Sequence, residues 1–139
     1  MRRVSTRQKQ IKKVEALFRK LLKQERGAVC EICGRHEQNL PYALSLFHIL
    51  RKGVYPKLRF HRQNVLLVCW TPHYNKHYCH DAWHLCNKDE PEYRRVREKL
   101  QKLRGEAFED DLKIIDKISQ KLSMMSLKHL ERAFKQELE

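Results

Sequence analysis

The chain has 139 residues, of which 41% are hydrophobic and 34% are charged, so it can fold as one domain with a modest core. Its 30 Lys and Arg outnumber its 17 Asp and Glu, and the formal charge of +13 favours polyanionic partners, of which nucleic acid is the commonest. No apolar run approaches the ~20 residues of a membrane span, which excludes a transmembrane protein, and no signal segment is visible, so we expect a cytoplasmic location.

The first predicted element is a basic helix over residues 5–25. Its apolar residues recur at the spacing of one helical face, and they include Ile11, Val14, Phe18 and Leu21. Gly27 follows as a stop signal. Residues 1–26 hold ten Lys or Arg and two Asp or Glu, a local charge of +8, so much of the positive charge lies at this end.

Two strands with a loop between them are expected next. Residues 43–50 are apolar enough for a strand, and residues 64–70 predict a stronger one because apolar and β-branched side chains dominate them. Residues 51–56 contain the Gly and the Pro of a loop. A short helix is predicted over residues 81–85.

Three further helices are predicted toward the C-terminus. Asp89, with Glu92 three residues later, can cap the first, which ends at Gly105. The side chains expected on its buried face are Tyr93, Val96, Leu100 and Leu103. The second covers residues 107–122, and the third covers residues 126–138 with Ser126 as its N-cap.

This order of elements predicts an α+β fold in three parts, which together form a single domain. A basic N-terminal helix occupies residues 1–27, a central core occupies residues 28–88, and a helical extension occupies residues 89–139. The C-terminal helices can complete the core, or they can bind a protein partner or a second copy of the chain.

The five cysteines favour metal ligation, because their number is odd and no secretory signal accompanies them. Cys30 and Cys33 form a CxxC motif followed by a glycine, which is the usual shape of a zinc knuckle. Cys69 stands at the end of the second predicted strand. We expect Cys79 to be the fourth ligand of a structural zinc ion, and His73 is the alternative.

Motifs of the central core follow one another in a fixed order. They are the CxxC, His48 followed by Ile, Asn64 with four residues before Cys69, and a Cys-His-x-x-x-His pattern over residues 79–84. In this order they resemble the HNH, or His-Me finger, endonucleases of phage and bacterial genomes, over about residues 28–86. The resemblance implies a zinc-stabilised ββα-metal finger, an enzyme that hydrolyses DNA, and a bacterial or phage-infected host cell.

The resemblance also assigns catalytic roles. His48 takes the position of the general base, which draws a proton from water, and an imidazole titrates near neutral pH. Asn64 takes the position whose side-chain amide pins a loop and orients the base. His84 completes the catalytic set, and with His80 it would bind a catalytic divalent ion, which could be Mg²⁺, Mn²⁺ or a transition metal.

One position departs from the family pattern. Members commonly place Asp or His directly before the base as a further metal ligand, whereas this chain has Phe47, which coordinates nothing. An alternative function is therefore a non-catalytic, zinc-stabilised module that binds nucleic acid or a protein partner.

Basic residues follow the predicted base in the sequence, and DNA is the expected partner. They can bind the phosphates that flank the scissile bond. The residues that we expect to make these contacts are Lys57, Arg59, Arg62, Arg94 and Arg95.

Overall fold

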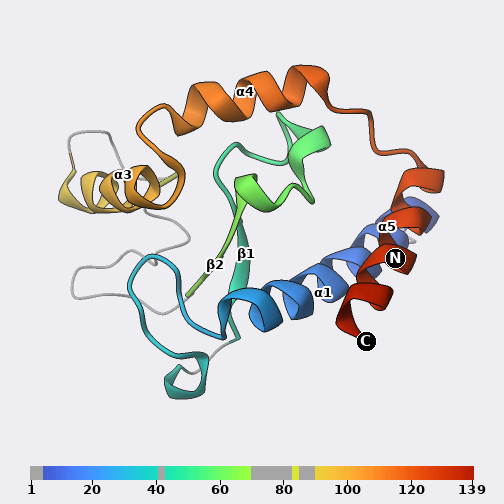
Figure 1. The fold of residues 1–139 in the computed structure, drawn as a ribbon, viewed down its shortest axis with the longest axis horizontal. Helices are drawn as coiled ribbons and strands as arrows, with labels where there is room; N and C mark the ends of the chain where they lie inside the picture. The colour runs from blue at the N-terminus through green and yellow to red at the C-terminus, as the bar shows by residue number, and fades with distance from the viewer. Residues whose placement is uncertain (1–4, 41–42, 70–82, 85–89) are drawn as a thin grey trace.

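The computed structural model describes residues 5–40, 43–69, 83–84 and 90–139 of the chain (Figure 1). Within these residues the fold is α+β, as predicted, with four α-helices and one two-stranded sheet. In the view of Figure 1 the sheet lies between α1 below and α4 above, and α5 returns to cross α1. None of the described helices is both long and apolar enough to cross a bilayer.

Helix α1 (Thr6–Arg26) confirms the predicted N-terminal helix. Its N-cap is Ser5, whose side chain and backbone exchange hydrogen bonds with Gln8 in a capping box. Gly27 ends the helix in a conformation with φ of +85°, which a residue without a Cβ adopts without strain. The residues that α1 buries are Gln10, Val14, Phe18, Leu21 and Leu22.

Strands β1 (Ser45–His48) and β2 (Val65–Val68) pair antiparallel, with His48 opposite Val65 and Ser45 opposite Val68. Both are shorter than the predicted strands. The chain bends at Ile49 and Leu50, and Asn64 belongs to a short 3-10 helix (Arg62–Asn64) that precedes β2. All four residues of β2 are buried, so the sheet is covered on both faces.

The C-terminal helices are α3 (Pro91–Arg104), α4 (Phe108–Ile118) and α5 (Met124–Leu138). The predicted capping of α3 by Asp89 lies outside the described residues; Glu90 occupies the N-cap position and makes no side-chain capping bond. Leu103 was expected on the buried face, but 38% of it is exposed because it lies in the last turn, beside Arg104.

The N-cap of α5 is also different from the prediction. Ser123 caps the helix by accepting a hydrogen bond from the Ser126 N–H at 3.1 Å, so Ser126 stands inside the first turn. The helix begins at Met124, two residues earlier than expected, because Ser123 has an extended backbone and can reach that N–H. Trp83 and His84 lie in a turn, and the rest of the predicted helix over residues 81–85 lies outside the described residues.

One hydrophobic core joins all of these elements. Phe18 of α1 stacks on Phe134 of α5, with ring centroids 5.2 Å apart, and meets the edge of the Phe60 ring. Trp83 stacks on Tyr93 of α3 at 4.7 Å, which attaches residues 83–84 to the C-terminal helices.

Candidate functional site

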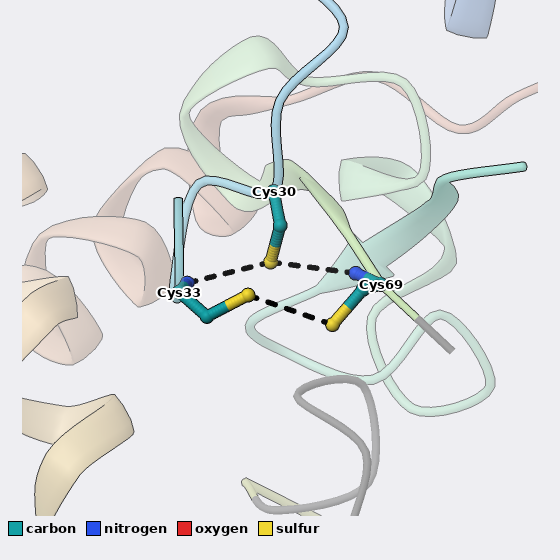
Figure 2. A group of neighbouring side chains, drawn as sticks. All are labelled: Cys30, Cys33 and Cys69. Atoms are coloured by element: carbon teal, nitrogen blue, oxygen red, sulfur yellow. Dashed lines mark hydrogen bonds between the residues drawn. The ribbon is translucent and has the colours of Figure 1, made fainter. Parts of the chain in front are cut away.

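The CxxC segment folds as a tight turn after α1. The Cys30 carbonyl accepts the Gly34 N–H at 2.9 Å, and the Cys30 N–H donates to the Arg35 carbonyl at 2.9 Å. Gly34 has a φ of +81°, a region that L side chains rarely adopt, so a glycine suits this position. The turn brings the sulfur atoms of Cys30 and Cys33 onto the same side of the chain (Figure 2).

Three sulfur atoms gather at this turn, from Cys30, Cys33 and Cys69 (Figure 2). All lie within 4.8 Å of one another, and the sulfurs of Cys33 and Cys69 are 3.7 Å apart. A tetrahedral zinc ion with bonds of about 2.3 Å separates its sulfur ligands by about 3.8 Å. The three cysteines are therefore close enough to bind one metal ion, and the distance between Cys33 and Cys69 fits zinc.

Backbone N–H groups and an arginine surround the sulfur atoms. The Cys30 sulfur accepts the N–H groups of Cys33 and Cys69, each at 3.4 Å. Arg35 donates from Nε to Cys33 and from Nη2 to Cys69, each at 3.4 Å, and the hydrogen bond to Cys33 is the largest cause of its raised pKa. Such donors stabilise thiolates, which are the form in which cysteine binds metal.

Glu31 ties the cysteine turn to the outer edge of β2. Its N–H donates to the Leu67 carbonyl at 2.8 Å, and its carboxylate accepts the Leu67 N–H at 2.6 Å. Arg26 binds the same carboxylate at 3.2 Å and donates to the Val65 carbonyl at 2.8 Å. These bonds hold Cys69, two residues beyond Leu67, against the turn without involving the sulfur atoms.

Both candidates for a fourth ligand, Cys79 and His73, lie outside the described residues, as does His80. The described part of the site therefore comprises three cysteines. Whether a cysteine or a histidine completes it stays a prediction from the sequence.

His48, the predicted general base, ends β1 and is 8% exposed. Its Nε2 lies 3.0 Å from the Arg59 carbonyl oxygen. A carbonyl only accepts, so Nε2 carries the proton and Nδ1 keeps its lone pair. Burial lowers the pKa of His48 to about 4, against a weaker opposing effect of the Arg59 hydrogen bond, so the imidazole is neutral at pH 7 and can accept a proton.

Asn64 is fully buried and holds the loop between the strands. Its Oδ1 accepts the Leu50 N–H at 2.8 Å, and its Nδ2 donates to the carbonyls of Leu50 at 3.1 Å and Leu58 at 3.3 Å. Leu58 directly precedes Arg59, whose carbonyl binds His48. The side-chain amide thus pins the loop that orients the predicted base, which is the role that the resemblance implies for it.

His84 lies against the end of β1, yet both of its ring nitrogens are engaged. Nε2 lies 2.7 Å from the His48 carbonyl and therefore donates to it, which leaves Nδ1 to accept from Arg51 Nε at 3.3 Å. The ring also stacks on Phe47, with centroids 5.4 Å apart. In this arrangement no lone pair of His84 faces outward, so ligation of a metal requires Arg51 to move away.

Two of the residues expected to contact DNA also make ion pairs within the fold. Arg59 binds Glu15 of α1 at 3.0 Å, and Arg62 binds Glu25 of α1 and Glu137 of α5, each at 2.9 Å. These ion pairs connect the loop between the strands to the two helices, and a DNA contact of either arginine stays a prediction. The other three expected contacts keep side-chain surface in solvent: Lys57, Arg94 and Arg95.

Two residues of this site have no counterpart among the predicted ones. Arg51 holds His84 through its ring and its carbonyl, the latter at 2.7 Å, and Glu15 anchors Arg59. Their partners lie 33 and 44 residues away, respectively, so no local pattern in the sequence marks either residue.

In comparisons with known proteins, no family model, no curated protein and no solved structure matches this chain. The likeness to HNH endonucleases therefore rests on the order and spacing of the sequence motifs. The roles of the described residues rest on the contacts given above.

Proposed function

We propose that the chain is a metal-dependent endonuclease of the HNH type, which hydrolyses DNA phosphodiester bonds with His48 as the general base. The observation that carries this proposal is the tautomer of His48. Its Nε2 is held by the Arg59 carbonyl, and the supporting loop is held by Asn64. A neutral histidine with an unprotonated ring nitrogen can take a proton from water, although burial lowers the pKa of His48 to about 4 and so weakens it as a base.

The residues of the site have distinct tasks in this proposal. Nδ1 of His48 takes a proton from the attacking water while the Arg59 carbonyl keeps the ring in place. A divalent ion, when bound, stabilises the charge on the leaving oxygen. His80 and His84 are its proposed ligands, and Arg51 would have to release the ring of His84 first.

We include a structural zinc ion in this proposal, held by Cys30, Cys33, Cys69 and a fourth ligand that we expect to be Cys79. The separation of 3.7 Å between the sulfurs of Cys33 and Cys69 supports zinc, and Arg35 offsets part of the thiolate charge. Zinc holds tetrahedral thiolate sites and undergoes no redox chemistry, which suits a role in stability.

The first experiment compares cleavage of a supercoiled plasmid by the wild type, His48→Ala and His48→Asn with Mg²⁺, Mn²⁺ or Ni²⁺. We expect both variants to lose about 100-fold or more in rate, the usual contribution of a general base, while their affinity for the plasmid is unchanged. His129→Ala is the matched control, because His129 is an exposed histidine of α5. Thermal unfolding verifies that each variant is folded.

The nuclease proposal fails if the His48 variants cut as fast as the wild type. It also fails if they lose cleavage and DNA affinity in equal measure, because a general base is not needed for binding.

A second function, a nucleic-acid-binding module without catalysis, is favoured by two specific observations. Phe47, which is fully buried, occupies the position before the base and cannot coordinate a metal. His84 has both ring nitrogens occupied. A wild type that binds the plasmid and leaves it uncut with every metal would establish this function in place of the first.

The zinc ion is tested separately by its effect on stability. A strong chelator should lower the melting temperature of the wild type, because metal binding to a folded site contributes directly to folding free energy. Cys33→Ser should melt at the lower temperature with or without the chelator. A wild-type melting curve that the chelator leaves unchanged, together with metal analysis that finds no zinc, would contradict the zinc proposal.

A further inference from the structure

The solvent-exposed side of α1 carries a row of lysines, which we call the lysine face: Lys9, Lys12, Lys13 and Lys20. These residues, with the exposed Ala16 among them, lie opposite the buried stripe of the helix. Lys20 follows Lys9 by eleven positions, which corresponds to about 16 Å along the helix axis.

The lysine face has no carboxylate of its own. The acidic residues of α1 are Glu15 and Glu25, and both bind arginines of the rest of the fold at 3.0 and 2.9 Å, respectively. The first turn contains no acidic residue that would offset the helix dipole. Lys23 is excluded from the face because it binds Glu37 at 2.7 Å.

The four lysines therefore repel one another along one side of a helix. Like charges three or four residues apart destabilise a helix, and Lys9 is in this relation to both Lys12 and Lys13. None of the ion pairs found among the described residues includes a lysine of this face. A polyanion would relieve the repulsion by neutralising several charges at once.

We propose that the lysine face binds the phosphate backbone of duplex DNA. About 16 Å of helix matches about five phosphate steps of 3.4 Å along one strand. The exposed residues of α1, all of which the structure describes, include no aromatic side chain on which an unpaired base could stack. Contact with the backbone of a duplex therefore fits this surface better than contact with single strands.

An anionic membrane fits the face less well than DNA does. A helix that lies in a membrane inserts its apolar side, whereas the apolar side of α1 packs in the core against α5 through Phe18 and Phe134. As the substrate of the proposed endonuclease, the duplex rests on that proposed function, whereas the binding of DNA at this face does not require catalysis.

The test measures the affinity for a duplex of about 25 base pairs by fluorescence anisotropy, without divalent ions, at several salt concentrations. The variant replaces the four lysines of the face with Gln. Its matched control replaces four other exposed lysines with Gln and has the same net charge: Lys113, Lys117, Lys121 and Lys128. A third variant replaces the lysine face with Arg, which keeps the charge.

We expect the Gln variant of the face to bind at least about 30-fold more weakly at moderate salt, and its slope of log affinity against log salt to decrease by about 3. The control should change less than about threefold, and the Arg variant should bind like the wild type. The proposal is overturned if the face variant binds like the wild type, if both Gln variants lose affinity equally, or if the wild type prefers phosphatidylserine vesicles to the duplex.

The outcome separates this inference from the nuclease proposal. A wild type that binds DNA through the lysine face and never cuts it would support the proposed DNA-binding role of the face and contradict the nuclease proposal. Cleavage that persists unchanged when the four lysines are replaced would support the nuclease proposal and contradict the DNA-binding role of the lysine face.

Discussion

Asn64 is the residue on which the geometry of the candidate site depends most directly. Its amide bonds three backbone groups of the loop between the strands, and two of them, the N–H and the carbonyl of Leu50, have Asn64 as their partner, whereas the Leu58 carbonyl also accepts the His61 N–H at 3.1 Å. Buried backbone groups without partners are costly, so the loop needs this side chain to keep its path. The Arg59 carbonyl, and with it the orientation of His48, follows from that path.

Replacing Asn64 with Ala should therefore destabilise the protein by about 2 kcal/mol or more, because it leaves the buried N–H and carbonyl of Leu50 without partners. Urea unfolding monitored by circular dichroism measures the change. Gln63→Ala is the control, since Gln63 is the exposed neighbour and should alter stability by less than about 0.5 kcal/mol. An Asn64→Ala variant as stable as this control would contradict the role of the amide.

His48 makes stability depend on pH in a defined direction. Burial lowers its pKa in the fold to about 4, from 6.5, so between these values the unfolded chain binds the proton more tightly than the folded one. The stabilisation by neutral His48 is therefore complete above pH 6.5 and is lost as the pH falls toward 4. The full effect is about 3 kcal/mol.

Urea unfolding at pH values between 4 and 7 should show a steeper loss of stability in the wild type than in His48→Gln. His61, whose pKa burial also lowers, is present in both proteins, so the difference between the two profiles reports His48. Parallel profiles would show that His48 does not carry this dependence.

The resemblance to HNH endonucleases selected His48 and Asn64 as candidate site residues, and the CxxC motif with Cys69 predicted the group of three cysteines that the structure brings together. The sequence did not identify the groups that hydrogen-bond to the candidate histidines and fix their ring orientation. The Arg59 carbonyl reaches His48 only through the course of the loop, and Arg51 reaches His84 across 33 residues. The ion pairs of Arg59 and Arg62 could not be predicted for the same reason, because their carboxylate partners are remote in the sequence.

At the scale of elements, helix α5 depends on its first turn. Ser123 accepts the Ser126 N–H, and the two hydroxyl groups lie 2.9 Å apart. Apolar periodicity located the helix correctly, but the predicted cap, Ser126, lies three residues after the actual one. The extended backbone of Ser123 makes it the cap in the structure.

Ser123→Ala should therefore cost about 1 kcal/mol of stability, the usual contribution of an N-cap, and Ser126→Ala should cost clearly less. Thermal unfolding of the two variants side by side measures the difference. The assignment of the cap is wrong if Ser126→Ala proves the more damaging change.

The lengths of the elements show how tertiary contacts override local preference. The sequence predicted α1 to within one residue at each end, because the residues that start and stop this helix, Ser5 and Gly27, directly flank it in the sequence. It overestimated both strands, because the chain at Leu50 is bent by the contacts with Asn64. A long-range bond of that kind has no local signature.

At the scale of the whole molecule, the C-terminal helix returns to the N-terminal one. Phe134 stacks on Phe18 with an interplanar angle of 12°, and Arg62 lies 6.0 Å from the ring centre of Phe134. Arg62 also joins Glu25 of α1 to Glu137 of α5. The helices of the C-terminal extension thus complete the core, which was one of the roles expected for them.

Phe134→Ala should destabilise the protein by about 3–5 kcal/mol, because it leaves a cavity beside Phe18 and removes the aromatic stack. Met125→Ala is the control on the same helix, since 79% of Met125 is exposed. Urea unfolding measures the free energy of unfolding of the two variants. A small effect of Phe134→Ala would mean that α5 is not needed to close the core.

The cysteine turn also has a consequence for the outer edge of β2. Glu31 binds both backbone groups of Leu67, and Arg26 binds the Val65 carbonyl, so side chains and a turn cover an edge where another strand could pair. Open edges of apolar strands are the usual starting points of aggregation. The turn that gathers the cysteines therefore also occupies an edge of the sheet at which a strand of a second chain could otherwise pair.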